Sequence, residues 1–193
     1  PEAVREVSIT VADGDGGTSA AQTVSIQVVT PPVVVPPDPP DFTITYTEGD
    51  DAQLIDDELQ TSVPGPSTTL TVTITGGAVT AEDVLELGTG VSGVGAGGFI
   101  SVTPDGGATV FFQQTGGTNG DPLVFTVFGG GTASAAHFEL LASAVAYRNS
   151  GGDTPTDGDR TVTFEATASG GGTSTVGTYT VDVNPVNDLS TLS

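Results

Sequence analysis

The sequence predicts an all-β protein, a β-sandwich with one short helix, and three observations support this class. Gly occurs 28 times and Pro 13 times beside abundant Thr and Val, which is typical of strands separated by turns. Segments of strand length run apolar or alternate between turn residues: FTITY, LTVTIT, FISV, TVFF, LVFTVF, TVTFEAT and TYTVDV. A chain of 193 residues can form one domain with a core, or one domain plus a fragment.

The charge balance excludes several classes of partner. The 24 Asp and Glu residues face three Arg and no Lys, so the formal net charge is −21. No part of such a chain could neutralise phosphates, which excludes nucleic acid and argues against docking on an anionic membrane. No apolar run approaches the roughly 20 residues of a spanning helix, so membrane insertion is not expected. Cysteine is absent, so disulfides and thiol sites are excluded. The aromatic and β-branched runs argue against a disordered acidic tail.

Residues 1–29 are expected to form a two-stranded hairpin around an Asp- and Gly-rich turn, and the pattern returns near the end of the chain. With Arg5 placed on Arg160, an offset of 160 − 5 = 155, residues 5–28 align without a gap to 160–183 and coincide at eight of 24 positions. This register indicates a tandem repeat, with 1–29 as the C-terminal hairpin of a preceding copy. Because an isolated hairpin is only marginally stable, we expect it to lie on the main domain or to pair with an edge strand of another copy.

Residues 30–41 are rich in proline and are expected to form a semi-rigid polyproline II linker. The complete domain is then residues 42–188, followed by the start of the next linker at 189–193. Within it we expect strands over 70–75, 161–167 and 177–183, and an irregular acidic loop over 52–67. Residues 88–98 are too glycine-rich for a stable element. Ser134 can cap one helix that runs to about Leu141, with Phe138 and Leu141 on its buried side.

Four segments together carry a family resemblance: TYTEGDDAQLID, VTITGGAVTAEDVLELG, AVAYRNSGGDTPTDGDRTVTF and TVDVNPVND. Over roughly residues 42–188 the chain resembles the cadherin-like tandem repeats of giant secreted bacterial surface adhesins. The resemblance implies an immunoglobulin/cadherin-like Greek-key β-sandwich, repeats joined end to end, type I secretion and calcium near the junctions. The proline-rich linker departs from the acidic VND-like exit that the family would have before the domain.

The acidic residues also indicate calcium (Ca²⁺) without the resemblance. Calcium takes six to eight oxygen ligands from carboxylates, amides and carbonyls, and acidic loops supply these. The candidate ligands fall in four clusters: Asp13 and Asp15; Glu48, Asp50 and Asp51; Asp153, Asp157 and Asp159; and Asp182, Asn184, Asn187 and Asp188. The spacing does not match an EF-hand, because Val24 stands where a loop from Asp13 would need Glu. The alternative is that these acids form turns and a solvated surface.

Catalysis has little support, and we expect no enzyme. His137, the one histidine, lies in the predicted helix, where packing or a helix surface is the expected role, and no Ser/His/Asp arrangement can be placed around it. The glycine runs lack the lysine of a phosphate loop. Arg160 is expected to pair with nearby carboxylates as a structural tie.

We therefore expect a non-catalytic structural repeat of an extracellular, cell-surface protein, which extends and stiffens its parent. Its expected partners are neighbouring repeats and other copies of itself. One alternative is a filament or surface-layer subunit that uses the hairpin of residues 1–29 for pairing between chains. Another is a glycan-binding module that uses the loops around residues 99–128, although the chain has no Trp and only three Tyr.

Overall fold

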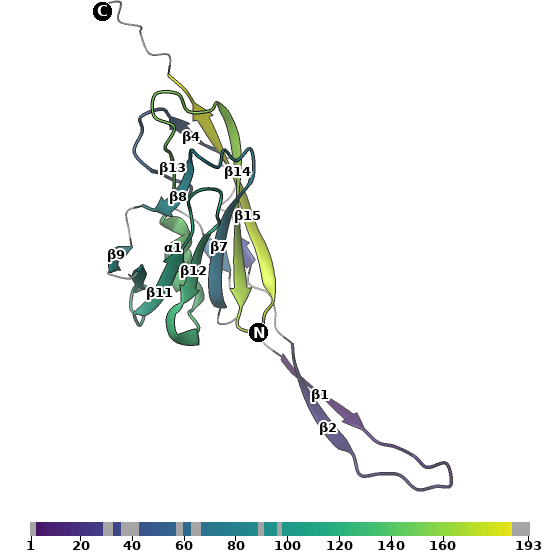
Figure 1. Cartoon of the computed structure of the whole chain (residues 1–193). Coiled ribbons are helices and arrows are strands. Elements are labelled where there is room, and N and C mark those ends of the chain that lie inside the picture. The colour runs from purple at the N-terminus through teal and green to yellow at the C-terminus, as the bar shows by residue number, and fades with distance from the viewer. Residues whose placement is uncertain are drawn as a thin grey trace, which may run out of the picture.

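The structure is a computed structural model that describes residues 3–28, 33–35, 43–56, 60–62, 67–88, 91–95 and 98–186. It confirms an all-β sandwich with one short helix (Figure 1). The largest sheet has eight strands in the order β4-β15-β14-β7-β12-β11-β10-β9. Their bounds, in that order, are Thr43–Thr47, Thr173–Asn184, Gly158–Ala168, Ser67–Gly76, Leu123–Val127, Val110–Thr115, Phe99–Val102 and Ser92–Gly95.

A smaller sheet and the helix cover the apolar face of the large sheet. The small sheet has the order β5-β13-β8, with bounds Gln53–Leu54, Val145–Asn149 and Asp83–Leu87. Helix α1 spans Ala135–Ser143, after the 3-10 turn η1 at Phe128–Gly130. A further pair joins β3 (Val33–Val35) to β6 (Gln60–Ser62).

The core forms because strand residues alternate between buried and solvent-facing positions. In β14 the pattern is regular, and Val162, Phe164 and Ala166 are fully buried. Phe112 and Phe138 meet edge to face at 5.5 Å between ring centroids, which joins the large sheet to α1. Tyr46 and Tyr147 meet in the same way at 5.4 Å and join β4 to β13. The large sheet, the small sheet and α1 therefore share one core.

Most expected elements are confirmed, and tertiary pairing accounts for the exceptions. Strands β7, β14 and β15 contain the expected strands over 70–75, 161–167 and 177–183. The expectation that residues 88–98 carry no element is wrong, since β9 pairs with the edge strand β10. The loop expected over 52–67 also contains β5 and β6. In each case tertiary pairing stabilises a segment with weak strand propensity.

Helix α1 confirms the sequence prediction, except at its cap. Phe138 and Leu141 are fully buried, as expected. Ser134 is the N-cap residue, yet its hydroxyl makes no cap hydrogen bond and instead lies 2.7 Å from Nδ1 of His137. The linker expected over 30–41 contains strand β3, and its other residues lie outside the described ranges.

The chain enters and leaves the sandwich at opposite ends. Strand β4 runs parallel to β15 over five residue pairs, from Thr43↔Thr180 to Thr47↔Asn184. In Figure 1, β15 rises toward one end of the sandwich, whereas the N-terminal hairpin lies beyond the other end. We call the end formed by the turn 48–51, the loop 150–157 and Val186 the exit pole.

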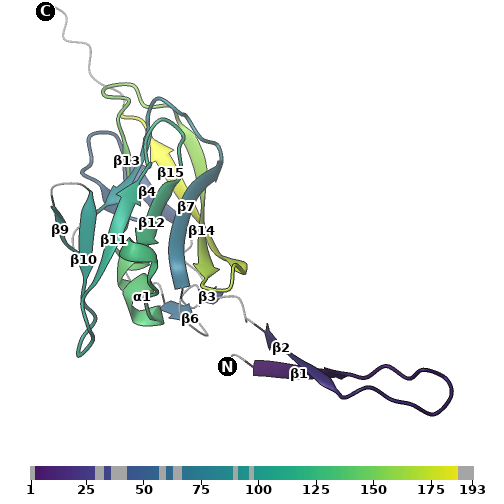
Figure 2. The same cartoon turned by 60° about the horizontal axis from the view of Figure 1, so that its bottom comes forward.

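The N-terminal hairpin consists of β1 (Ala3–Ile9) and β2 (Gln22–Val28). Both views show it extending away from the sandwich (Figures 1 and 2). Its described residues are exposed almost throughout, and these include Val7, Ile9 and Ile26. It therefore does not lie on the main domain, and pairing with another sandwich stays a prediction.

Candidate functional site

The most constrained polar group is a buried ion pair between Arg160 and Asp83, whose side chains are 2% and 3% exposed. Arg160 Nε donates to both carboxylate oxygens, at 3.0 and 3.1 Å. Its Nη1 and Nη2 donate to the carbonyls of Gly158 and Thr156, each at 2.7 Å. Asp83 begins β8 and Arg160 lies in β14, so the pair joins the two sheets. The prediction that Arg160 is a structural tie is confirmed.

The carboxylate of Asp83 has further partners. The Tyr147 hydroxyl donates to Oδ1 at 2.5 Å, and the Val79 amide donates to Oδ2 at 2.5 Å. Asn149 Nδ2 lies 3.4 Å from Oδ1. Burial, together with the hydrogen bond to Asp83, raises the pKa of the Tyr147 phenol, so this group stays a donor. The buried charge is thus surrounded by donors, which is the condition for burying an ion pair.

Glu82, next to this pair, holds the loop 150–157 in place. Its carboxylate accepts hydrogen bonds from the amide and the hydroxyl of Thr156, at 2.8 and 2.9 Å. Its carbonyl accepts from the Ser150 amide at 2.7 Å. The Thr156 amide is the main cause that lowers the pKa of Glu82. The loop is therefore fixed at both its start and its end.

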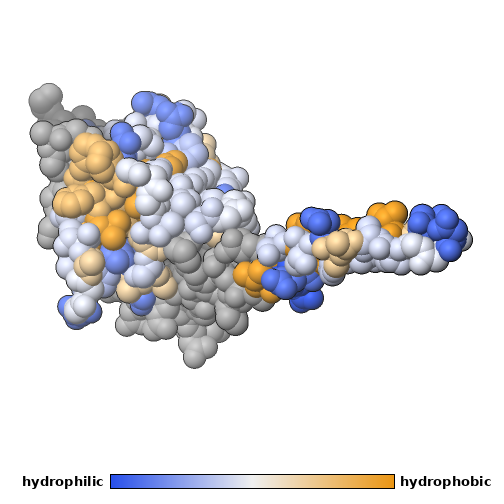
Figure 3. All heavy atoms as spheres, turned by 90° about the horizontal axis from the view of Figure 1, so that it is seen from below, coloured by the Kyte–Doolittle hydropathy of each residue, from blue (hydrophilic) through white to orange (hydrophobic). Residues whose placement is uncertain are grey.

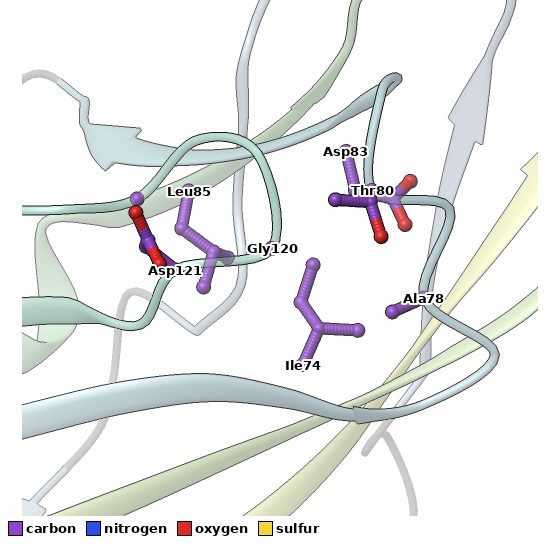
Figure 4. Close-up of a pocket in the computed structure, with 8 residues that line it drawn as sticks. Ile74, Ala78, Thr80, Asp83, Leu85, Gly120 and Asp121 are labelled. Atoms are coloured by element: carbon purple, nitrogen blue, oxygen red, sulfur yellow. The ribbon is translucent and has the colours of Figure 1, made fainter.

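A small cavity lies beside Asp83 (Figure 4). Its volume is about 20 Å³, which suits about one water molecule and no larger ligand. The side chains of Ile74 and Leu85 point into the space in Figure 4, and Gly117, Gly120 and Asp121 also line it. This cavity is a packing feature beside the ion pair.

A wider opening of about 500 Å³ lies at the exit pole. Glu48, Asp50 and Asp153 line it, and they come from two of the clusters predicted to bind metal. Glu48 Oε2 accepts from the Val186 amide at 2.8 Å, and Asp50 Oδ2 accepts from the Thr47 amide at 2.9 Å. Arg148 also lines the opening, and its Nε lies 3.5 Å from Oε2 of Glu86. The fold thus brings together carboxylates that are far apart in the sequence.

At the tip of the N-terminal hairpin, Asp13 acts as a turn former. Its Oδ1 accepts from the amides of Asp15 and Gly17, at 3.3 and 2.9 Å. A side-chain hydrogen bond with Asp15 is the largest cause that lowers the pKa of Asp13, and the hydrogen bonds from these amides lower it further. The geometry at this cluster matches the alternative that its acids form turns.

Of the remaining predicted ligands, Asp51 and Asp157 belong to the exit pole, and Asp159, Asp182 and Asn184 lie in β14 and β15. Asp159 and Asp182 lie directly opposite each other on β14 and β15, and Asn184 Nδ2 donates to Asp182 Oδ2 at 3.2 Å. Asp51 and Asp157 are exposed, and Asn187 and Asp188 lie outside the described residues. Among the residues that the structure describes, no three His, Cys, Asp or Glu side chains lie close enough together to hold a metal ion.

His137 packs in the core, as expected. It is 6% exposed, and Nε2 donates to the carbonyl of Ala108 at 2.8 Å. The three tyrosines are all buried as well. Phe111 and Phe128 are more than half exposed, and Phe128 meets Phe99 edge to face at 4.6 Å. A glycan site around residues 99–128 would depend on these phenylalanines and stays a prediction.

The sequence did not predict that Glu82, Asp83, Tyr147 and Asn149 form a connected group. A signal for them existed, because they lie in AEDV and AYRN, which are parts of two segments that carry the family resemblance. Their function could not be assigned because the pair Asp83 and Arg160 is 77 residues apart in the chain.

Comparison of the chain with protein-family models, with curated proteins and with solved structures finds no match in any of the three. Within the described ranges, no helix has the length and apolar character needed to span a bilayer.

The buried pair makes Arg160 the most sensitive cation of the chain. We expect Arg160→Met to lower the free energy of unfolding by about 3–5 kcal/mol, because it leaves the Asp83 charge buried without its partner. Arg148→Met is the control, since its pair with Glu86 is more than a third exposed and contributes less than about 1 kcal/mol. Urea unfolding of the three proteins measures both effects, and equal losses for the two variants would contradict this role of the pair.

The lowered pKa of Glu82 predicts a loss of stability in acid. Its pKa is ordinarily 4.5 and lies lower in the folded state, so its contribution is complete above pH 4.5 and disappears as the pH falls through the folded value. Glu82→Gln keeps an acceptor for the Thr156 amide but cannot titrate. Urea unfolding at pH values above and below 4.5 should therefore show a smaller acid-induced loss for the variant than for the wild type. Parallel pH profiles would disprove the assignment.

Proposed function

We propose that this chain is a non-catalytic structural repeat that extends and stiffens a longer extracellular protein. The observation that carries the proposal is the second copy of its last hairpin. Residues 3–9 and 22–28 pair in the same register as residues 158–164 and 177–183, at the offset of 155 found in the sequence. A unit that occurs twice in one chain is the property of a tandem array.

The sheet topology supports a load-bearing role. Because β4 and β15 are parallel and lead to opposite ends of the chain, tension pulls them along their length in opposite directions. The hydrogen bonds between the two strands are then loaded together. A sandwich with this arrangement suits a spacer that must resist stretching.

We propose calcium as the cation of the exit pole. Glu48, Asp50 and Asp153 line one opening there, and Val186 on its rim directly precedes Asn187 and Asp188 in the sequence. Oxygen ligands of this kind suit calcium, and a bound cation would reduce the self-repulsion of a chain with a net charge of −21. Because Arg148 lines the same opening, we expect weak binding.

The parent that we propose is a cadherin-like adhesin of a bacterial surface. The sequence segments that carry this resemblance include the residues of the buried network, Asp83, Tyr147, Asn149 and Arg160. The neighbours of the chain would be other repeats of the same protein. This proposal assigns adhesion itself to other parts of the parent.

Single-molecule stretching tests the load-bearing role. The chain has no Cys, so pairs of introduced Cys define the direction of load. We expect a higher unfolding force for Thr43→Cys with Val186→Cys, which shears β4 along β15, than for Asp51→Cys with Val186→Cys. In the second pair both introduced Cys residues lie at the exit pole, so the hydrogen bonds between β4 and β15 break one after another. Equal forces, or a lower force in shear, would refute the proposal.

Thermal melting with calcium and with a chelator tests the cation. We expect calcium to raise the Tm of the full chain, because a ligand that binds the folded state stabilises it. Asp153→Asn should remove most of the shift, whereas Asp105→Asn, in the exposed turn before β11, should keep it. Magnesium serves as the control cation. Identical melting with calcium and with chelator would leave these acids as turn and surface residues.

A further inference from the structure

We propose that the N-terminal hairpin β1–β2 completes a second sandwich of this kind, one that lacks its own last hairpin. It would occupy there the slot that β14–β15 occupies here. The inference rests on the proposed repeat function, since it names the partner through which adjoining repeats would be joined.

The two hairpins agree in strand register, although their tips differ, since Gly14 has a φ of 88° and Ser169 at the equivalent position has no positive φ. All seven residue pairs of β1 and β2 recur in β14 and β15, from Ala3↔Val28 and Gly158↔Val183 to Ile9↔Gln22 and Phe164↔Gly177. The bridge Ala12↔Thr18 recurs as Thr167↔Thr173. At the tip, the bond from the Asp13 amide to the Gly17 carbonyl recurs between Ala168 and Gly172. The N-terminal hairpin is therefore a second copy of β14–β15 in register as well as in sequence.

The two copies differ in what covers them. In the N-terminal copy, one face carries five apolar side chains that are 42–67% exposed: Val7, Ile9, Val11, Val24 and Ile26. At the offset of 155, their counterparts in the sandwich are 1% exposed or less: Val162, Phe164, Ala166, Tyr179 and Val181. Figure 3 shows apolar patches along the free hairpin. A face with this pattern on a marginal hairpin needs a partner, and the covered copy shows which surface suits it.

The slot in the sandwich has three defined features. Strand β14 pairs with β7, and β15 pairs with β4, so the hairpin lies between two strand edges. The carboxylate of Asp83 lies beside the slot and receives Arg160. Arg5 stands at the place of Arg160 in the N-terminal copy. The partner must therefore have two free strand edges, an apolar surface between them and a buried carboxylate.

Two coupled differences between the copies are compatible with docking. A side chain at Gly177 would collide with the ring of Tyr179. The N-terminal copy has Gln22 in place of Gly177 and Val24 in place of Tyr179. The side chain added at the first position is therefore accompanied by a smaller side chain at the second. Ile9 and Val24 are smaller than Phe164 and Tyr179, which indicates an acceptor with larger side chains opposite them, or with a small residual cavity. This chain's own slot is filled by its own hairpin, so the proposed acceptor is a different sandwich.

A tandem chain tests the inference. In this protein, residues 30–159 come first and are followed directly by the chain from Arg5 onward. The first sandwich then has no β14–β15 of its own, and β1–β2 follows it in the sequence. The readout is limited trypsin digestion, since Arg5, Arg148 and Arg160 are the only tryptic sites of the natural sequence. We expect Arg5 to be cut readily in the full chain and at least about tenfold more slowly in the tandem chain, because a closed strand is cut only when it opens.

Two adjacent substitutions provide matched controls within the tandem chain. Val7→Asp places a charge on the face that would be buried, and should restore fast cleavage at Arg5. Ser8→Asp places the same charge on the opposite face, and should leave Arg5 protected. If the tandem chain does not fold, the full chain with Phe164→Ile, Gly177→Gln and Tyr179→Val decides the question. This variant should fold and keep Arg160 protected, and its unfolding would overturn the inference.

Unchanged cleavage at Arg5 in a folded tandem chain would overturn the inference. A second result would also overturn it: protection of Arg5 in the full chain only at high concentration, with no protection in the tandem chain. The partner that buries the hairpin would then be an intact second copy of the chain. Neither result would affect the stretching experiment or the effect of Asp153→Asn on the calcium-induced Tm shift, because the residues that these two experiments probe lie within 43–186. Failure of the docking and failure of the repeat function are therefore distinguishable.

Discussion

The ion pair between Arg160 and Asp83 is the constraint on which the rest of the sandwich depends. A guanidinium and a carboxylate can stay buried only if nearly all their hydrogen-bonding positions are occupied, because the desolvation of two charges opposes folding. Here the occupants come from the turn before β8, from β13 and from the loop 150–157. The pair therefore helps to fix the loop, to dock β14 and to join the two sheets, together with Glu82 and the Tyr46–Tyr147 contact. The scarcity of cations in the chain makes this position conspicuous.

The hairpin that carries Arg160 occurs twice, once inside a core and once outside it. Its backbone register is the same in both places, so the register follows from the local sequence and its tight turn. Burial follows from what surrounds it, since only β14–β15 lies between two strand edges. A hairpin whose backbone register does not depend on the surface that buries it can pair with a neighbouring sandwich as easily as with its own. This independence is what would allow the proposed serial architecture.

The acidic residues are distributed in a way that favours extension. Asp159 and Asp182 face each other on adjacent strands, an arrangement of like charges that is unfavourable without a cation or high salt. Glu48, Asp50 and Asp153 gather at the same end of the molecule. Negative charge thus gathers at this end of the molecule. Under the proposed repeat function, repulsion there would keep successive units apart, and a shared cation would fix the angle between them.

By itself, the sequence determined the all-β class, the strands β7, β14 and β15, helix α1 and the duplicated hairpin. These are local properties, because alternation, turn residues and register act over a few neighbouring residues. Only the tertiary structure decided that Asp83 is the partner of Arg160, that Glu48 and Asp153 share one opening, and that 92–95 is a strand. Each depends on contacts between segments far apart in the chain. Asp13 shows the limit of pattern alone, because an Asp-Gly turn has the same sequence whether its carboxylate binds a cation or its own backbone.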